Sequence, residues 1–542
     1  MKFHPFLYST LCLGVLSVSA AAASAALPRT WSVAAGAGAG AGRDPNCPFA
    51  PAHLPAALPA PAPAALRAAL DSLGAGLDSA INNVSLPSAV VSVAYRGASI
   101  YTHGAGEIKK GTGRAPDAHT RYRIGSVTKV FPVLQLYQRA REPESGVGLD
   151  DPLAAHGHKI FFRNEFPPGG RQPSLRELAS QRGGLPREAP CANVLMCGNV
   201  TSAEMAAKIN ASDATTLIHP PGAPLPSYSN LAFALLGREL VPDVATATTW
   251  EGWTQTHILD ALNLTRTGFG LDWPTLDSNT ATGYEPDGKS TGDYHLGWTA
   301  PAGGMHSTTH DLNMLADAIM TGRAFGGDTV AANEMMSPVF LNPGGTTLFG
   351  TPWEMRFHNA TGFLVRRKGG NVPGFTALLA FVPELRLSVS ALFSGQADEF
   401  GASQKIFDTL LPPLVDALQA MGTDAPRQPK DPASFVGNFT ARGYPKGSPG
   451  SGARILVHDG SLVLVVEALG VGLYLRVPDW AAATEEVAGT VMMQWWGQRE
   501  KMPCLTGELS AYSGQYVIFE EDLSSFSIPG LLGDRFVLER DA

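Results

Sequence analysis

The chain has 542 residues, of which 16% are charged, and a formal net charge of −8. A length of this size indicates two domains rather than one. The charges form no long block of one sign, which argues against nucleic-acid binding and is compatible with a small neutral or mildly polar substrate.

The first residues have the pattern of a signal peptide. Lys2 and His4 precede the apolar stretch 11–18, and small residues around Ala23-Ser24-Ala25 provide an A-x-A cleavage site. We therefore expect residues 1–25 to be a signal peptide and the protein to be secreted. No later segment has the roughly eighteen continuous apolar residues that span a bilayer, so we expect no membrane partner.

N-x-[ST] sequons support secretion independently. Six sequons spread along the chain fit a glycosylated secretory protein, fungal or otherwise eukaryotic. Their asparagines are Asn83, Asn199, Asn210, Asn263, Asn359 and Asn438.

Cysteine usage agrees with an oxidising compartment. Removal of the signal peptide takes away Cys12 and leaves an even number of cysteines. Of the three pairings that four cysteines allow, we favour a short loop closed by Cys191 and Cys197, which leaves Cys47 to pair with Cys504.

Residues 26–85 are expected to form an N-terminal arm. A glycine-alanine alternation covers 34–42, and 50–65 is rich in proline and alanine. Neither stretch has a helical or strand period strong enough to bury a face. We expect the arm to be flexible up to Cys47 and then extended over the surface.

Strand patterns mark both ends of the next region, residues 86–425. Runs at 90–95 and 99–101 flank a turn at Arg96-Gly97, and runs at 376–381 and 387–393 close the region. Strands at both ends of a helical middle predict an α/β (α+β) domain: an antiparallel sheet flanked by helices, with a mainly helical second lobe.

Ser126 and Lys129 form an S-x-x-K pattern near the start of this region. Residues three apart lie on the same face of a helix, so the amine can reach the hydroxyl. An uncharged amine could take the proton of the serine and make it a nucleophile. The pattern by itself is weak, because S-x-x-K also occurs in ordinary helices. Pro132 follows closely and predicts a kink or tightened turn.

Two further patterns follow in order: Tyr228-Ser229-Asn230 after a proline-rich loop, and Lys368-Gly369-Gly370 before Pro373-Gly374. Each has a plain structural interpretation when taken alone. Tyr228 could anchor a loop, Asn230 could cap the helix predicted from Leu231, and Lys368 could belong to a solvated run of cations.

Together, the three patterns resemble the serine β-lactamase and penicillin-binding-protein superfamily, specifically its class C-like branch of esterases and D-aminopeptidases. Two flanking stretches are similar to the family as well, and the resemblance covers roughly residues 86 to 425. These stretches are Leu178–Pro186, which ends in Gly-Leu-Pro, and Gly303–Thr308 followed by Asp311-Leu312.

The resemblance implies a role for each motif residue. Ser126 would attack a carbonyl to form an acyl-enzyme, and Lys129 or Tyr228 would accept its proton; the sequence leaves this division open. Tyr228 could instead protonate the leaving group. Asn230 would donate a hydrogen bond to the substrate, and Lys368, in the motif that ends at Gly370, would supply positive charge beside Tyr228. The backbone N–H groups of Ser126 and Asn371 would form the oxyanion hole. Arg367 is the neighbouring alternative for Lys368.

One departure from the family narrows the function. Gly369 stands where threonine or serine is common, so a hydroxyl that often binds a substrate carboxylate is missing. We therefore predict a secreted serine hydrolase, an esterase or amidase acting on a small molecule. An acyltransferase using the same acyl-enzyme is the alternative, and a β-lactamase or a non-catalytic binding protein is a weaker one. No cofactor or metal is expected, and the oligomeric state stays open.

Ser290 is a rival candidate nucleophile, because it lies in Gly288-Lys289-Ser290-Thr291-Gly292. This stretch fits G-x-S-x-G but has no strand before it and no helix after it. A nucleophile elbow needs both, so a surface turn is predicted.

Residues 426–542 have a different character. Runs at 455–457 and 462–465 around Asp459-Gly460 predict a hairpin with a favoured turn pair. Further short strand runs continue to 536–538, so we expect a separate β-sandwich or small barrel.

Overall fold

The computed structural model describes residues 54–81, 85–167, 169–193, 197–198, 200–241, 249–270, 277–421, 428–429, 431–446, 448, 451–458, 461–466, 471–476, 492–496, 516–520, 522–528 and 537–541. The predicted signal peptide lies outside these residues, as do Cys47, Cys504, Asn83 and Asn199. Within the described part of the chain, no helix combines the length and the apolar character needed to cross a membrane.

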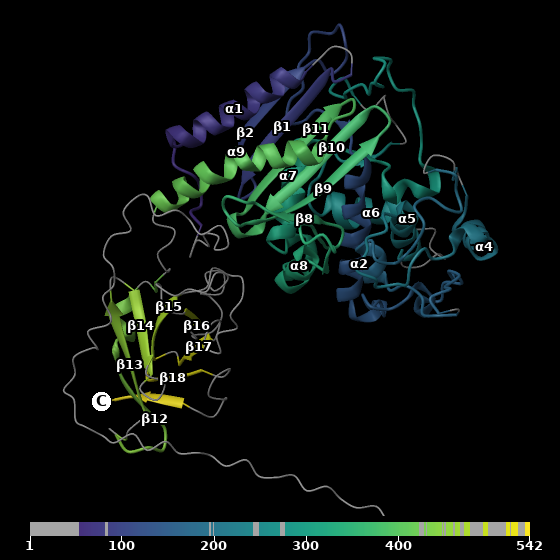
Figure 1. Ribbon diagram of the computed structural model, residues 1–542. Coiled ribbons are helices and arrows are strands. Elements are labelled where there is room, and N and C mark those ends of the chain that lie inside the picture. Colours follow the sequence, from purple (N-terminus) through teal and green to yellow (C-terminus); the bar gives the residue numbers. More distant parts are fainter. Residues whose placement is uncertain are drawn as a thin grey trace, which may run out of the picture. The chain divides into compact units, whose positions relative to one another are not determined.

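An antiparallel sheet of eight described strands forms the centre of the first domain (Figure 1). Its order is β2-β1-β11-β10-β9-β8-β7-β6. The strands are β1 (Ser88–Tyr95), β2 (Ala98–Gly106), β6 (Phe340–Leu341), β7 (Leu348–Phe349), β8 (Glu354–Phe357), β9 (Leu364–Val372), β10 (Phe375–Val382) and β11 (Leu387–Ser394). The predicted strands at both ends of the region are confirmed as β1, β2, β10 and β11. They are also neighbours, because β1 pairs with β11 from Ser88↔Ser394 to Tyr95↔Leu387.

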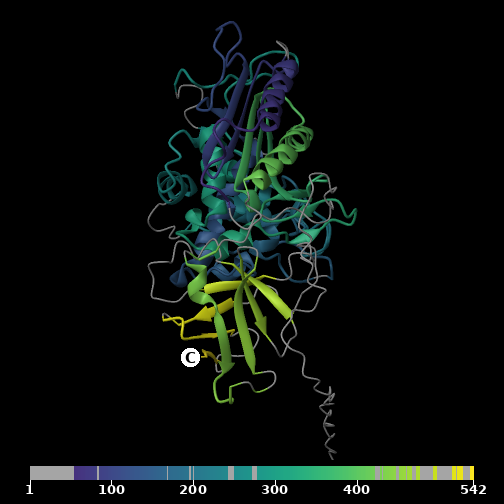
Figure 2. The ribbon, with the colours of Figure 1, turned by 90° about the vertical axis from the view of Figure 1, so that its left-hand side faces the viewer.

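Each face of the sheet packs into its own apolar core. Alternate residues of β10 point to opposite faces, as the strand period requires. Leu378, Ala380 and Val382 join the core beneath α1 (Ala64–Ala80) and α9 (Glu399–Ala420), whereas Ala377, Leu379 and Phe381 join the core of the helical lobe. Both views show α1 and α9 together over one face of the sheet (Figures 1 and 2). This arrangement matches the predicted sheet flanked by helices.

Helix α1 corrects the prediction for the N-terminal arm. The arm up to residue 85 was expected to be extended over the surface beyond Cys47, but residues 64–80 are helical. Leu66, Leu70, Leu73 and Leu77 are buried and join the same core as the sheet. Their spacing of three to four residues is an amphipathic signal that the alanine- and proline-rich composition obscured. The domain therefore begins before residue 86.

The helical lobe lies on the other face of the sheet. It contains α2 (Val130–Arg141), α3 (Leu175–Ala179), α4 (Ser202–Ala211), α5 (Asn230–Glu239), α6 (Trp250–Thr254), α7 (Thr309–Met320) and α8 (Thr329–Met336), all of which contribute buried residues to one core. A small sheet of β3 (Tyr122–Arg123), β5 (Met305–Ser307) and β4 (Gly268–Phe269) lies next to it.

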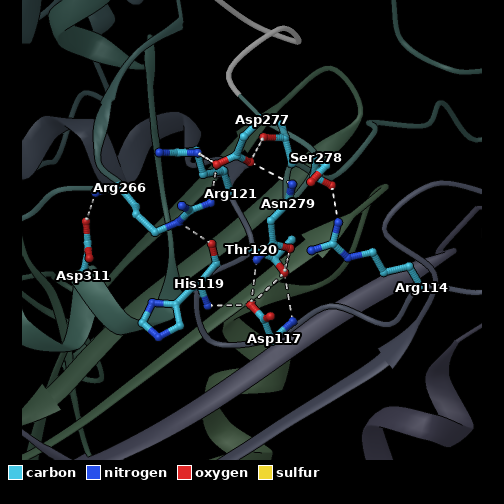
Figure 3. A network of polar contacts seen from close by, with 11 residues as sticks. Arg114, Asp117, His119, Thr120, Arg121, Arg266, Asp277, Ser278, Asn279 and Asp311 are labelled. Carbon is cyan, nitrogen blue, oxygen red and sulfur yellow. Dashed lines mark hydrogen bonds and ion pairs between the residues drawn. The ribbon is translucent and has the colours of Figure 1, made fainter.

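A polar network holds the segment that leads into Ser126 (Figure 3). Asp277 accepts hydrogen bonds from Arg121, from Arg266 Nη2 at 2.8 Å and from the Asn279 backbone N–H at 2.8 Å. Burial alone would raise the pKa of the Asp277 carboxyl, but these hydrogen bonds and the charge of Arg121 lower it to about 2. The carboxylate thus ties Arg121, the residue that precedes β3, to the segments around residues 266 and 279.

The C-terminal residues form a closed barrel, which resolves the predicted choice between a sandwich and a barrel. Its strands are β12 (Gly437–Ala441), β13 (Gly452–His458), β14 (Ser461–Val466), β15 (Val471–Arg476), β16 (Met492–Trp496), β17 (Tyr516–Phe519), β18 (Ser525–Ser527) and β19 (Val537–Arg540). The predicted hairpin is confirmed as β13 and β14, which pair from Ala453↔Val466 to His458↔Ser461. Aromatic side chains, among them Phe439, Phe519 and Phe526, fill the interior.

We predict that Asp277→Ala lowers the free energy of unfolding by about 1–2 kcal/mol near neutral pH, because charge-assisted hydrogen bonds are lost from a side chain that is 36% exposed. The pKa of Asp277 is depressed in the folded state, so this stabilisation exists above the unfolded-state pKa and disappears as the pH falls towards 2. Denaturant unfolding at several pH values measures it. The matched control is Asp287→Ala, whose carboxylate pairs with Lys289 on an exposed turn and should leave the stability nearly unchanged. Equal losses in both variants would contradict the role of the network.

Candidate active site

Ser126 and Lys129 lie in a 3₁₀ helix, η1 (Gly125–Lys129), rather than in a regular α-helix. Residues i and i+3 eclipse each other in a 3₁₀ helix, so the amine lies directly against the hydroxyl. Lys129 Nζ donates to Ser126 Oγ at 2.8 Å. This is the tightened turn predicted from Pro132, which is the third residue of α2. A proline is tolerated there because backbone N–H groups of the first turn have no intrahelical partner.

Tyr228 reaches the same serine from a loop in front of α5. Its hydroxyl donates to Ser126 Oγ at 2.7 Å. The loop is held by its neighbours: Ser229 N–H donates to Gln181 Oε1 at 2.8 Å, and Ser229 Oγ donates to the Pro186 carbonyl at 2.7 Å. The predicted stretch Leu178–Pro186 therefore positions Tyr228. Ser229, not Asn230, caps α5, because its side chain accepts from the Ala232 N–H.

Lys129 is completely buried and has three hydrogen-bond partners. Besides Ser126, they are Asn230 Oδ1 at 2.7 Å and the Ala302 carbonyl at 2.6 Å. Both of these oxygens can only accept, so they require N–H groups from Lys129. When Lys129 is neutral, its two N–H groups satisfy them and its lone pair faces Ser126 Oγ. The amine is thereby oriented to accept the serine proton.

Lys368 occupies a different electrostatic environment on β9. Its side chain is buried, and Nζ donates to Glu354 Oε1 at 3.0 Å and to the Gly369 carbonyl at 3.1 Å. Burial tends to lower the pKa of Lys368, but the Glu354 carboxylate outweighs it and the pKa is raised. Lys368 thus stays a cation, and the prediction that places it at the site is supported by a distance of 5.3 Å between Nζ and the centroid of the Tyr228 ring. The alternative, Arg367, stacks on Phe400 instead.

Lys129 has the opposite shift. Burial lowers the pKa of Lys129 to about 8, with a further contribution from the positive charge of Lys368, because the neighbouring Tyr228 and Glu188 only partly oppose it. For Tyr228, burial raises the pKa, but the charges of Lys129 and Lys368 outweigh burial and the pKa falls below its usual value of 10.0. One amine is therefore a fixed charge and the other can lose its proton near neutral pH.

The backbone segments predicted to form the oxyanion hole are in close contact. A Cβ on Gly370 would lie 2.8 Å from the Ser126 nitrogen, and a Cβ on Gly125 would lie 2.8 Å from the Asn371 nitrogen. Side chains at either position would separate η1 from β9. The glycines therefore allow the two N–H groups to approach one another, and Gly125 also has a φ of +48°.

Two acidic residues of the site were not predicted. Glu354 binds Lys368, and Glu188 Oε1 accepts from Asn230 Nδ2 at 2.5 Å. The predicted role of Asn230 changes accordingly, since its amide nitrogen donates to Glu188 and its oxygen serves Lys129. Glu188 lies two residues after Pro186, the end of the Gly-Leu-Pro stretch. This position could have indicated that Glu188 belongs to the site. Glu354 has no signal in its sequence context.

The structure pairs Cys191 with Cys197, as predicted. Four of the sequon asparagines lie on the described surface and are exposed: Asn210, Asn263, Asn359 and Asn438. Ser290, the rival nucleophile, is exposed and forms an isolated β-bridge with Tyr284 at a surface turn. The other calls on cysteines and sequons fall outside the described residues.

The chain belongs to the β-lactamase family, whose model matches residues 67–411, more than half of the sequence. This places it in a superfamily of serine hydrolases. The match begins inside α1, in agreement with the corrected domain start.

Similar proteins occur in eukaryotes. Human beta-lactamase-like 1 is 34% identical over 335 residues, which make up 60% of this chain and 64% of the human protein. Beta-lactamase-like protein 2 of Dictyostelium discoideum is 27% identical over 378 residues, 67% of this chain and 66% of that protein. The chain therefore spans slightly less than two thirds of the length of these relatives.

Solved structures share the fold. An octameric penicillin-binding protein homologue from Pyrococcus abyssi aligns with a TM-score of 0.52 at 18% identity and covers 87% of this chain and 98% of its own. A D-stereospecific amidohydrolase from Streptomyces has a TM-score of 0.51 at 22% identity, covering 64% and 98%. A class C β-lactamase has a TM-score of 0.51 at 19% identity, covering 64% and 96%. At these identities the likeness shows the fold alone.

We predict that Ser126 reacts with a serine-directed fluorophosphonate at a rate that rises with pH and has an apparent pKa of about 8, because Lys129 can accept the proton only when it is neutral. Labelling rates from pH 6 to 10, followed by intact mass, measure this. Lys129→Arg keeps the positive charge but cannot lose a proton, so its labelling should fall at least about 100-fold and should not recover at high pH. A variant that unfolds at the same temperature as wild type yet labels at the same rate would exclude Lys129 as the base.

Proposed function

We propose that this protein is a secreted serine hydrolase that forms an acyl-enzyme at Ser126 and acts on an ester or amide of a small molecule. One observation carries the proposal: Ser126 Oγ lies 2.8 Å from Lys129 Nζ and 2.7 Å from the Tyr228 hydroxyl. Ser126 is partly exposed whereas Lys129 is buried. A substrate can therefore reach the nucleophile while the amine that acts as its base is shielded from solvent.

The reaction would begin with the loss of the serine proton. Neutral Lys129 takes the proton as Ser126 Oγ bonds to the acyl carbon, and the negative charge on the carbonyl oxygen is stabilised by the backbone N–H groups of Ser126 and Asn371. Such donors are typically worth about 3 kcal/mol each in acyl transfer. The carbon–oxygen or carbon–nitrogen bond of the donor then breaks, and Tyr228 protonates the leaving group. Lys129 then returns its proton directly to the neighbouring Tyr228 oxygen.

Deacylation would use the same groups in reverse. Tyr228 first passes its proton to neutral Lys129 and then takes a proton from the water that replaces the leaving group. The water oxygen bonds to the acyl carbon, the bond from that carbon to Ser126 Oγ breaks, and Lys129 returns the proton to Oγ. Lys368 remains charged throughout because Glu354 binds it, and it keeps the proton on Tyr228 easy to remove. The two buried amines thus divide the work between proton acceptance and electrostatic support.

We predict that wild-type protein given an activated short-chain ester shows a mass increase equal to the acyl group, and that Ser126→Ala shows neither the adduct nor turnover. The loss should be at least about 1,000-fold, in the range seen when a nucleophile is removed from a serine hydrolase. Ser290→Ala is the matched control, since Ser290 lies on a surface turn, and it should keep full activity.

The same assay separates the neighbouring possibilities. A chromogenic cephalosporin and a D-alanyl amide serve as further donors, and we expect both to be poorer than the ester because Gly369 lacks a hydroxyl. An adduct that decays only after an alcohol or amine is added would establish an acyltransferase. Turnover by Ser126→Ala at the wild-type rate would overturn the proposed mechanism.

We also propose secretion with N-glycosylation. The signal-peptide pattern, the Cys191–Cys197 disulfide and the exposure of Asn210, Asn263, Asn359 and Asn438 support it. Expression of the full chain in a eukaryotic host should yield protein in the medium that begins after the A-x-A site. Its mass should fall on treatment with an N-glycosidase. Full-length, unglycosylated protein retained inside the cell would contradict the proposal.

A further inference from the structure

Glu399, in the first turn of α9, lies directly over Gly369 of β9. A Cβ built on Gly369 would be 2.7 Å from both Cγ and Oε1 of Glu399. A threonine or serine at position 369 would therefore place its side chain where the carboxylate now lies. The glycine does more than remove a hydroxyl from the third motif, because it makes room for an acidic group in the same place.

The position of the Glu399 carboxylate is defined by its neighbours. Asn371 Nδ2 donates to Glu399 Oε1 at 2.7 Å. Gly369 and Asn371 share one face of β9, while Lys368 and Gly370 lie on the other, because side chains alternate along a strand. Asp398 accepts from the Gly401 N–H at 2.9 Å and so caps the helix that carries Glu399. The carboxylate is thus held beside the residue whose backbone is predicted to line the oxyanion hole.

The Glu399 carboxylate makes no ion pair within the described part of the chain, although the positive charges of Lys368 and Arg367 act on it at longer range. Lys368 binds Glu354 at 3.0 Å, and no basic side chain of the described residues lies within ion-pair distance of Glu399. The guanidinium of Arg367 instead stacks on Phe400, with Cζ 4.5 Å from the ring centroid. Glu399 is also partly exposed, so a bound molecule that runs along β9 would meet a negative charge.

We propose that Glu399 determines specificity at this site: its carboxylate takes the place of a hydroxyl that would bind a substrate carboxylate, so the site rejects donors with a carboxylate in the leaving group and accepts neutral or cationic leaving groups. The inference rests on the proposed function, since it assigns the substrate class of the same acyl-transfer reaction. Like charges at close range in a partly desolvated site repel strongly enough to discriminate between such donors.

Three phenylacetyl thioesters test the inference. They differ only in the leaving thiol: mercaptoacetate is negative, mercaptoacetamide is neutral and thiocholine is positive. In each case the Ser126 Oγ–acyl bond forms, the carbon–sulfur bond breaks, and the serine proton leaves with the thiol. The release of thiol gives kcat/KM, and intact mass records the acyl-enzyme.

Glu399→Gln is the informative variant, because the amide keeps the size of the side chain and an oxygen that accepts from Asn371. We expect it to raise kcat/KM for the mercaptoacetate ester about tenfold. The value of kcat/KM for the mercaptoacetamide ester should change less than about twofold. The thiocholine ester should become a poorer donor. Glu384→Gln removes the same charge from a residue that pairs with Arg366, and it should leave all three values unchanged.

A second variant, Gly369→Thr with Glu399→Ala, restores the hydroxyl and should raise kcat/KM for the mercaptoacetate ester further. If Glu399→Gln turns over the neutral ester but leaves the ratio of negative to neutral donor unchanged, the inference is wrong while the proposed function stands. If wild type forms no acyl-enzyme with any of the three donors, the proposed function fails and the inference falls with it.

Discussion

The site depends on the burial of two lysine amines next to one tyrosine. Moving an ammonium group out of water is costly, and a protein can meet this cost with a counter-charge or by letting the group lose its proton. Lys368 has the first solution, a carboxylate at 3.0 Å. Lys129 has only neutral oxygens as hydrogen-bond partners, and its pKa falls to about 8. The different partners of two chemically identical groups create a fixed charge and a proton acceptor around Ser126.

Sequence patterns indicated the candidate residues that the structure brings together around Ser126, but not their electrostatic environment. Ser126, Tyr228 and Lys368 each lie in a short motif, and the order of these motifs can be read directly from the sequence. The strands that carry or support these residues have clear periodicity. The acidic residues that set the protonation states come from other segments. Glu354 and Glu399 approach β9 from a neighbouring strand and from a helix, and neither lies in a recognisable motif. Only packing of the whole domain places them.

The same distinction applies to the fold. The strands at both ends of the domain and the hairpin of the barrel follow directly from alternating apolar residues. Helix α1 was not predicted because the proline- and alanine-rich stretch 50–65 that leads into it has no amphipathic period, whereas Leu66, Leu70, Leu73 and Leu77 lie on one face of the helix. The structural alternative for Asn230, a helix cap, does not hold, because the neighbouring Ser229 caps α5 and both residue types serve as caps. Closeness in space to Gln181 and Pro186, rather than propensity, selects the serine.

The pairing of β1 with β11 has a consequence for biosynthesis. Ser88 and Ser394 are register partners although 306 residues separate them (394 − 88). At typical rates of about 5–20 residues per second, a ribosome needs roughly 15–60 s to make this stretch. During that time β1 lacks the neighbour that completes the central sheet, and the leucines of α1 lack the core they enter. A chain that crosses a membrane during synthesis would therefore fold, and acquire its nucleophile, only on the far side.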